Sequence, residues 1–205
     1  MTPDEFRQLL TQQTDQELLG PCLYGNETPY VFEPAPPAWD TFRALLVAQL
    51  GVAQQEIRVV GSARFGFSTA PGNNLRAFDD GSDIDLIVVN ADLFDQLWIA
   101  LLVAAYPRRP ITQTRSVGDF LQERRRELYT GWLTPLAVKL DLAIFGAKAR
   151  PVYEFNVRWF NALKEAAGIA PRRHEDITGR LYRTWRHAEL YHLNSLAALR
   201  QSLTP

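Results

Sequence analysis

The chain has 205 residues, of which 46% are hydrophobic and 22% are charged, and its formal net charge is −1. This length and composition predict one globular domain with room for a helical extension, and they exclude a disordered or fibrous protein. A net charge near zero argues against a chain that binds nucleic acid over its whole surface. The single cysteine, Cys22, excludes an intramolecular disulfide, and we expect a cytoplasmic protein.

Neither the first residues of the chain nor its longest apolar run indicates a membrane protein. The first ten residues, MTPDEFRQLL, are polar and acidic, so we expect no secretory leader. The longest apolar run, LWIALLVAAY at 97–106, is about half the ~20 residues that a membrane span requires. We therefore expect this run to form a buried helix and the protein to have no membrane partner.

The first 50 residues predict three helices. TPDE, beginning at Thr2, has a capping residue, a proline at the first helical position and a glutamate at the third, which predicts a helix to about Gln13. Thr14 and Glu17 form a second capping box. The five prolines of 21–37 predict an irregular arm, and apolar residues at helical spacing predict a helix over 38–50.

The central part of the chain alternates between strand and helix patterns. We expect strands at EIRVVGS (56–62) and DIDLIVV (83–89), followed by a helix over 92–105. GDFLQERRRELY predicts a helix over 118–129, and PLAVKLDLAIFG predicts a third strand over 135–146. From Pro151 onward the pattern is helical, and it ends in a long helix from about Asp176 to Leu203.

Two aspartates stand one residue apart at the start of a strongly apolar strand. Side chains alternate along a strand, so Asp83 and Asp85 lie on one face and Ile84 lies on the other. Two carboxylates this close repel each other, and both stay ionised only when a cation or several donors neutralise them. Mg²⁺, which takes carboxylate oxygens together with substrate phosphates, is the usual solution. The alternative is a solvated turn.

Two further features favour the metal interpretation. Gly61 and Ser62 follow a predicted strand, where a glycine lets a phosphate approach and the hydroxyl and nearby amides donate to it. The alternative is a plain strand-ending turn. Asp141 stands within VKLDLAIF, where an ionised carboxylate is costly unless it is paired or binds metal. For Asp141 the alternative is a salt bridge. The conjunction of all three features is more specific than any one of them.

The turn Gly61-Ser62, the run SDIDL at 82–86 and Asp141 together resemble the nucleotidyltransferase superfamily that includes DNA polymerase β. Within it, the chain is similar to small bacterial nucleotidyltransferases and to the cyclic-oligonucleotide synthases of antiphage defence. The resemblance covers about 57–146. The segment 63–81 is longer than in minimal members, and its insertion at 69–81 either covers the active site or meets a partner.

The resemblance implies an α+β fold, in which a mixed-sheet, polymerase β-like core carries flanking N- and C-terminal helices. It also divides the chain into three parts. These are N-terminal helices and an arm (1–55), the nucleotidyltransferase core (56–150) and a C-terminal helical extension packed on the core (151–205).

The same resemblance implies roles for the matching residues. Asp83 and Asp85 hold two Mg²⁺ or Mn²⁺ ions, and Asp141 completes the second metal site, so all three are catalytic. Gly61 and Ser62 bind the β- and γ-phosphates of a nucleoside triphosphate, and Ser82 belongs to the same nucleotide site. ATP is the favoured donor, and pyrophosphate leaves.

Basic residues offer further candidates for phosphate binding. Lys139 lies on the same face of the third predicted strand as Asp141. It either touches a phosphate or pairs with an aspartate. Arg180, Arg183 and Arg186 recur at helical spacing, and form either a solvated helix face or a strip facing the triphosphate. In the second case we expect Arg183 to bind the nucleotide.

Histidines and tyrosines near the C-terminus are weaker candidates for a metal or nucleotide site. His187 and His192 lack the i, i+4 spacing of a helical metal pair, so we expect polar or capping roles. Tyr182 and Tyr191 either stack on a base or pack in the core.

The function that follows is transfer of a nucleoside monophosphate from a nucleoside triphosphate to a hydroxyl acceptor. The acceptor is left open among a protein side chain, a nucleotide, an RNA end and a small molecule, and the absence of a long basic stripe disfavours an extended nucleic-acid surface. One alternative is a nucleotide-binding or scaffold module of a defence or toxin–antitoxin system, with little turnover and a protein partner. Another is a phosphohydrolase or simple cation site, which the glycine-serine turn disfavours.

Overall fold

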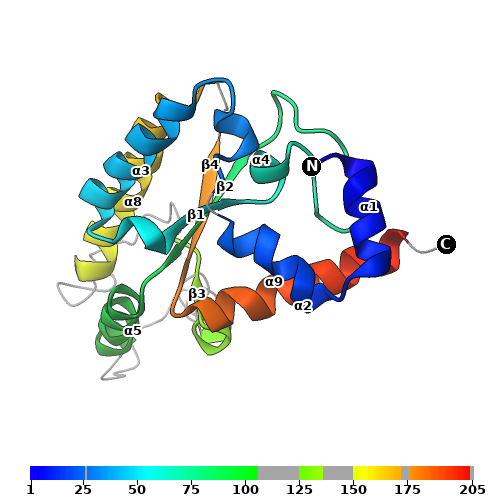
Figure 1. The fold of residues 1–205 in the computed structure, drawn as a ribbon. Helices are drawn as coiled ribbons and strands as arrows, with labels where there is room; N and C mark the ends of the chain where they lie inside the picture. The colour runs from blue at the N-terminus through cyan, green and yellow to red at the C-terminus, as the bar shows by residue number, and fades with distance from the viewer. Residues whose placement is uncertain (26, 106–124, 136–149, 172–175, 204–205) are drawn as a thin grey trace.

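Figure 1 shows a computed structural model of the chain, which describes residues 1–25, 27–105, 125–135, 150–171 and 176–203. Within these residues, four strands form one sheet in the order β1 (Ile57–Val60), β2 (Ile84–Val89), β4 (Ile177–Tyr182) and β3 (Trp132–Leu133). β2 pairs antiparallel with β1 and parallel with β4, and β3 is antiparallel to β4. The fold is therefore α+β with a mixed sheet, as the sequence predicts.

The N-terminal helices begin where their capping residues predict. In α1 (Pro3–Gln12) the Glu5 amide donates to Thr2 Oγ1 at 3.2 Å, and the Thr2 amide donates to Glu5 Oε2 at 2.7 Å. The same reciprocal bonds join Thr14 and Glu17 at the start of α2 (Asp15–Leu19). Such a box satisfies amides that the first helical turn leaves unpaired. Both predicted helix starts are confirmed.

The proline-rich arm is built of short turns. It contains a π-helical turn at Gly20–Tyr24 and a 3₁₀ turn at Tyr30–Phe32. The predicted helix at 38–50 is confirmed as α3 (Pro36–Leu50), and a 3₁₀ turn at Gln54–Glu56 leads into β1. The arm thus ends earlier than expected, because two prolines occupy the first turn of α3, where their fixed backbone angle favours a helix.

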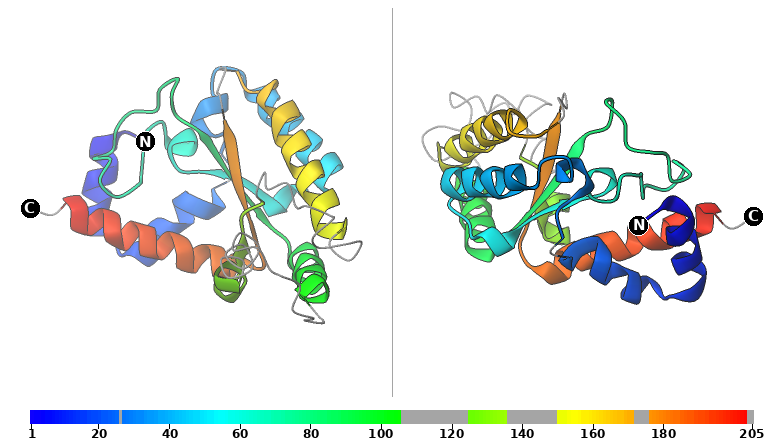
Figure 2. Two further views of the ribbon diagram at one scale, coloured as in Figure 1. Left: turned by 180° about the vertical axis from the view of Figure 1, so that it is seen from behind. Right: turned by 45° about the horizontal axis from the view of Figure 1, so that its top comes forward.

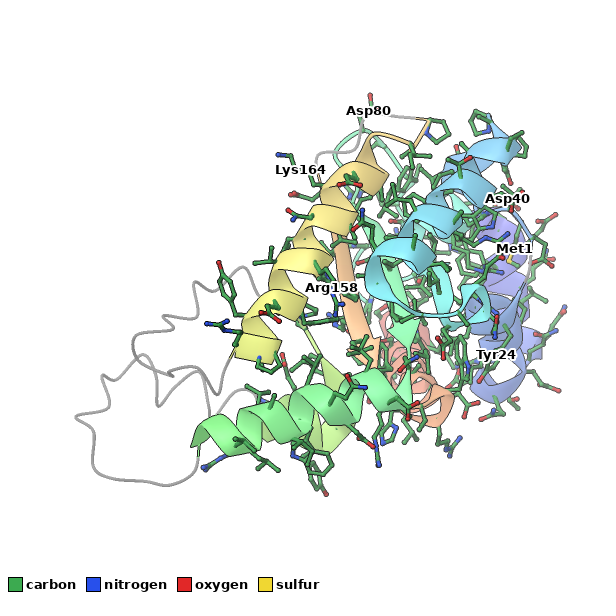
Figure 3. All side chains as sticks on the ribbon, turned by 90° about the vertical axis from the view of Figure 1, so that its left-hand side faces the viewer. Met1, Tyr24, Asp40, Asp80, Arg158 and Lys164 are labelled. Atoms are coloured by element: carbon green, nitrogen blue, oxygen red, sulfur yellow. The ribbon has the colours of Figure 1, made fainter. Side chains whose placement is uncertain are left out.

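Helices cover both faces of the sheet (Figures 1 and 2). α3, α5 (Ala91–Ala105) and α8 (Arg150–Ala167) lie on one face, and their outer surface carries exposed charges such as Asp40 and Lys164 (Figure 3). α1, α2 and α9 (Trp185–Leu203) lie on the other. No described helix is long and apolar enough to cross a membrane.

Alternating residues of β2 enter two separate hydrophobic cores. Leu86 and Val88 pack with α3, α5 and α8, whereas Ile87 and Val89 pack with α1, α2 and α9. A strand buried on both faces reads as a continuous apolar run. This explains the sequence LIVV, and it leaves Asp85 as the one polar residue within β2.

The long C-terminal helix predicted over 176–203 is wrong in its first third. Residues Ile177–Tyr182 form β4, and helix α9 begins only at Trp185. Ile177 and Thr178 are β-branched and Gly179 is a poor helix former, so the segment favours an extended backbone. Its pairing with β2 buries Leu181 completely. The C-terminal part of the chain therefore supplies a strand to the sheet as well as helices.

Two predicted elements lie partly or wholly outside the described residues. Residues 125–130 are helical, which agrees with the end of the helix expected over 118–129. From the strand expected over 135–146, only Pro135 is described. The short helix α4 (Ser62–Phe65), directly after β1, was not predicted.

Gly179 provides a direct test of how closely β4 packs. A methyl group here would lie 2.7 Å from Trp159 Cζ2 and 3.2 Å from the Leu86 carbonyl oxygen. We expect Gly179→Ala to lower the free energy of unfolding by about 1–3 kcal/mol, because overpacking forces neighbours to shift. Urea denaturation measures the change. Gly20→Ala is the control, since a methyl group there meets no atom within 4 Å, and equal effects of the two variants would contradict the packing.

Candidate functional site

A cavity of about 640 Å³ opens on the face of the sheet that carries Asp85. This volume is within the ~300–1,000 Å³ that is usual for small-molecule sites. Its lining comes from the end of β1, from β2 and β4, from α9 and from the loop 68–71. The residues on which its chemistry depends are Gly61, Ser62, Asp85, Thr178, Arg180 and His192.

Asp85 lies between two neighbouring strands in this cavity. It is in register with Val60 of β1 and with Thr178 of β4, and the Thr178 hydroxyl donates to Asp85 Oδ1 at 2.8 Å. Burial raises the pKa of the Asp85 carboxyl, and the charge of Asp83 adds to the rise, while the Thr178 hydrogen bond and Arg180 oppose it. The side chain nevertheless remains accessible to solvent. A cation bound here would restore the ionised form.

Gly61 brings the backbone directly against this carboxylate. Its φ of 65° and ψ of −143° are angles that side-chain-bearing residues rarely adopt, and a methyl group would lie 3.1 Å from Asp85 Oδ2. Ser62 follows as the first residue of α4 and also lines the cavity. The structure thus places the glycine-serine turn beside Asp85.

Asp83 and Ser82 lie just before β2 and differ in their surroundings. Asp83 is exposed, and its charge reaches Asp85, although Asp83 is not among the residues that line the cavity. Ser82 is buried, and its hydroxyl accepts from the Asp79 amide at 3.1 Å and donates to Asp79 Oδ1 at 2.9 Å. The Ser82 hydroxyl therefore stabilises the turn that leads into β2.

The structure does not bring Arg183 to the cavity. Its guanidinium donates to both carboxylate oxygens of Asp95 on α5, at 2.8 and 3.1 Å. Arg186, on α9, pairs with Glu189 at 2.9 Å. Neither alternative for these three arginines, a solvated helix face or a strip facing the triphosphate, is present, because Arg180 belongs to a strand and only Arg186 to the helix. Lys139 and Asp141 lie outside the described residues.

Sequence reasoning missed the part of the site that β4 supplies. Thr178 and Arg180 point to the same face as Asp85, since residues paired in register share a face. The signal was available in ITG, whose β-branched residues favour a strand and whose glycine disfavours a helix. Treating the segment as helix placed Arg180 with Arg183 and left Thr178 without a role.

His192 and His187 have different environments on α9. His187 Nδ1 lies 2.7 Å from the Thr184 hydroxyl just before the helix, as expected of a capping residue. His192 lines the cavity, and its Nε2 is buried without a hydrogen-bond partner among the described residues. Burial, reinforced by the charge of Arg180, lowers the pKa of His192 to about 4. The imidazole is therefore neutral at pH 7.

The insertion contributes to the cavity through its first residues. Thr69, Ala70 and Pro71 line it, as does Ser68 just before the insertion. The loop is held by a hydrogen bond from the Ser68 amide to the Arg76 carbonyl oxygen at 2.7 Å. Leu75 is buried against the α1–α2–α9 core, and Arg7 of α1 donates to Asn74 Oδ1 at 3.2 Å. Of the two roles expected for the insertion, its placement favours shaping the cavity.

The described residues provide a partial donor set for a divalent cation. They contain no group of three or more histidine, cysteine, aspartate or glutamate side chains suited to a metal. Asp83 and Asp85 nevertheless lie close enough for one carboxylate to raise the pKa of the other. Mg²⁺ is commonly held by one or two carboxylates together with substrate phosphates, so these residues fit such an ion.

Comparison with known proteins does not assign the chain to a family. No family model, curated protein or solved structure matches the chain.

Proposed function

We propose that the protein is a metal-dependent nucleotidyltransferase, which moves a nucleoside monophosphate from a nucleoside triphosphate, ATP in the favoured case, to a hydroxyl acceptor. The observation that carries the proposal is the meeting of Gly61 and Asp85 in one cavity. The turn at Gly61, which a phosphate can approach, contacts the Asp85 carboxylate, and the pKa of this carboxyl is raised. Asp85 belongs to β2, a strand that is buried on both faces. Such a strand fixes the position of the carboxylate, and positioning supplies much of phosphoryl-transfer catalysis.

Each residue has a defined part in this reaction. Asp83 and Asp85 hold Mg²⁺ or Mn²⁺, with Asp141 as the expected third carboxylate, and the metal neutralises charge on the phosphates. Ser62 and the backbone at Gly61 donate to the β- and γ-phosphates. Thr178 fixes the orientation of Asp85 through its hydrogen bond of 2.8 Å.

The bond changes follow from an in-line displacement. The acceptor oxygen bonds to the α-phosphorus while the bond to the bridging oxygen breaks on the opposite side. Pyrophosphate leaves with the bonding electrons, and the proton of the acceptor hydroxyl passes to solvent. The favoured nucleoside triphosphate thus supplies the energy of transfer, and no further co-reactant is required.

Incubation with each α-³²P-labelled nucleoside triphosphate and Mg²⁺ or Mn²⁺ tests the proposal. Products are separated as free nucleotide, labelled protein and labelled RNA, and the wild type is compared with Asp83→Ala/Asp85→Ala. We expect label to move in the wild type and to fall by orders of magnitude in the double variant, because both carboxylates bind the charge-neutralising metal. The destination of the label identifies the acceptor class.

The control is Asp92→Ala, which removes an exposed carboxylate at the far end of β2. Transfer that survives in the double variant would contradict the assigned site. Metal-dependent nucleotide binding without product in the wild type would favour a nucleotide-binding or scaffold module instead, of the kind expected in a defence or toxin–antitoxin system.

A further inference from the structure

Among the described residues that line the cavity, Arg180 is the permanent cation, and two aromatic rings hold it in place. Its guanidinium carbon lies 5.4 Å from the ring centre of Trp132 on β3 and 4.8 Å from that of Tyr191 on α9. The two rings pack edge-on against each other, 6.3 Å apart. Cation–π contacts of this kind fix a guanidinium while leaving its N–H edge available to a planar or tetrahedral oxyanion.

Arg180 is not bonded to a counter-ion within the described part of the chain. No carboxylate there forms a salt bridge with it, whereas Arg183 and Arg186 each have one. The neighbouring cavity residues His192 and Ser195 carry no charge at neutral pH, since the pKa of His192 is about 4. Asp85 lies within electrostatic reach of Arg180 but forms no salt bridge with it. A cation fixed in a partly enclosed cavity without a bonded counter-ion favours an anionic ligand.

The order of strands places Arg180 on the acceptor side of Asp85. Gly61 and Ser62 follow β1, on one side of β2, whereas Thr178 and Arg180 belong to β4, on the other. Because an in-line displacement has leaving group and acceptor on opposite sides of the phosphorus, pyrophosphate leaving toward Gly61 requires the acceptor on the β4 side. Arg180 is two residues beyond Thr178 along β4, which is roughly 7 Å of strand.

We propose that Arg180 binds a phosphate group of the acceptor, so that the acceptor is a phosphate-bearing hydroxyl compound and not a neutral one. The inference rests on the proposed transfer reaction. The distance along the strand suits a molecule in which hydroxyl and phosphate are several ångströms apart, as in a nucleotide or sugar phosphate. The phosphate belongs to a free nucleotide or to the backbone of an RNA end, which share this chemistry.

Equilibrium binding to the full chain tests the inference without requiring turnover. The protein is saturated with Mg²⁺ and α,β-methylene-ATP, and the probes are the four nucleoside 5′-monophosphates, their unphosphorylated nucleosides and a short oligoribonucleotide. We expect the wild type to bind at least one monophosphate or the oligoribonucleotide, and a monophosphate roughly tenfold or more tightly than its nucleoside. Arg180→Gln should lose that phosphate-dependent affinity, and Arg180→Lys should retain part of it.

Arg183→Gln is the matched control, since Arg183 is bonded to Asp95 outside the cavity. Binding of the oligoribonucleotide alone, dependent on Arg180, would support an RNA end as acceptor, and binding of a monophosphate would support a free nucleotide. The inference is wrong if no phosphate-bearing probe binds, or if binding is unchanged in Arg180→Gln. It is also wrong if that variant weakens α,β-methylene-ATP equally, because Arg180 would then serve the donor.

Two further comparisons keep the result interpretable. Thermal unfolding shows whether Arg180→Gln is folded. If it is not, Arg180→Lys decides, because loss of a phosphate contact weakens binding of the monophosphate more than binding of its nucleoside, whereas loss of packing weakens both. The α-labelled transfer assay is run in parallel. Absence of transfer with phosphate binding intact would overturn the proposed reaction and leave an anion site, whereas transfer to a neutral acceptor would overturn the role of Arg180 alone.

Discussion

Replacing Asp85 with asparagine is expected to stabilise the protein at neutral pH and to abolish nucleotide transfer. The folded-state pKa of Asp85 is raised above the ordinary value of 3.8, so the ionised carboxylate destabilises the folded state. Asparagine keeps an oxygen that accepts from Thr178 and removes the charge. Because solvent reaches the cavity and screens the group, the gain is about 1 kcal/mol or less, a rise of a few degrees in Tm.

The pH dependence of this gain has a definite sign. Below about pH 3.8 the Asp85 carboxyl is protonated in both the folded and the unfolded state. Position 85 should then contribute equally to the free energy of unfolding in the wild type and in Asp85→Asn. As the pH rises through the folded-state pKa, the wild type loses stability relative to the variant, and above that pKa the difference is constant. Urea denaturation at a series of pH values measures it. A difference that shrinks with rising pH would contradict the assignment.

Mg²⁺ should reverse the order of stability of the wild type and Asp85→Asn. Mg²⁺ binds the ionised carboxylate, so it raises the Tm of the wild type and has little effect on Asp85→Asn. Asp92→Asn, which alters an exposed residue away from the cavity, should respond to Mg²⁺ as the wild type does. Thermal unfolding with and without Mg²⁺ measures the response. Equal metal-induced shifts in wild type and Asp85→Asn would rule out Asp85 as a ligand.

Gly61→Ala is expected to lower transfer activity by about 100-fold or more, with a loss of about 1–3 kcal/mol in stability. The backbone angles at Gly61 disfavour any side chain, and the added methyl group lies 3.1 Å from Asp85 Oδ2. The carboxylate therefore has to move, and the methyl group also occupies the place where a phosphate would approach. Activity with α-labelled substrate and urea denaturation measure the two effects.

Gly51→Ala separates backbone strain from loss of the site. Gly51 ends α3 with φ of 70°, and a methyl group there meets no atom within 4 Å. We expect this variant to lose about 1 kcal/mol of stability through its left-handed backbone and to retain full activity. If Gly61→Ala is as active as Gly51→Ala, the turn after β1 has no part in the reaction.

Local patterns predicted much of the fold. The capping boxes at Thr2 and Thr14 were sufficient to predict the starts of α1 and α2, because the hydrogen bonds that form them join residues near in sequence. The apolar run after Asp85 was sufficient to predict β2, because a buried strand has a continuous hydrophobic pattern. The meeting of Gly61 with Asp85 was also predictable, since short antiparallel neighbours bring their adjoining ends together. In these places local preference and tertiary structure agree.

The β4 half of the site was not predictable in the same way. The extended form of Thr178 is stabilised by pairing with a strand far away in sequence, and the arginines at 180, 183 and 186 repeat with a spacing that suits a helix equally well. Tertiary pairing overrides such local periodicity. The role of Arg180 also depends on Trp132 and Tyr191, which come from two other elements.

The hydrogen bond from Thr178 to Asp85 joins residues 93 positions apart, and this separation has a consequence during synthesis. At ~5–20 residues per second, the ribosome adds Thr178 about 5–20 seconds after Asp85. For that interval β2 lacks its parallel neighbour, and the nascent chain exposes an apolar strand edge that other chains can pair with. The nascent chain therefore has an interval in which aggregation competes with folding, and the cavity around Asp85 is complete only after β4 is in place.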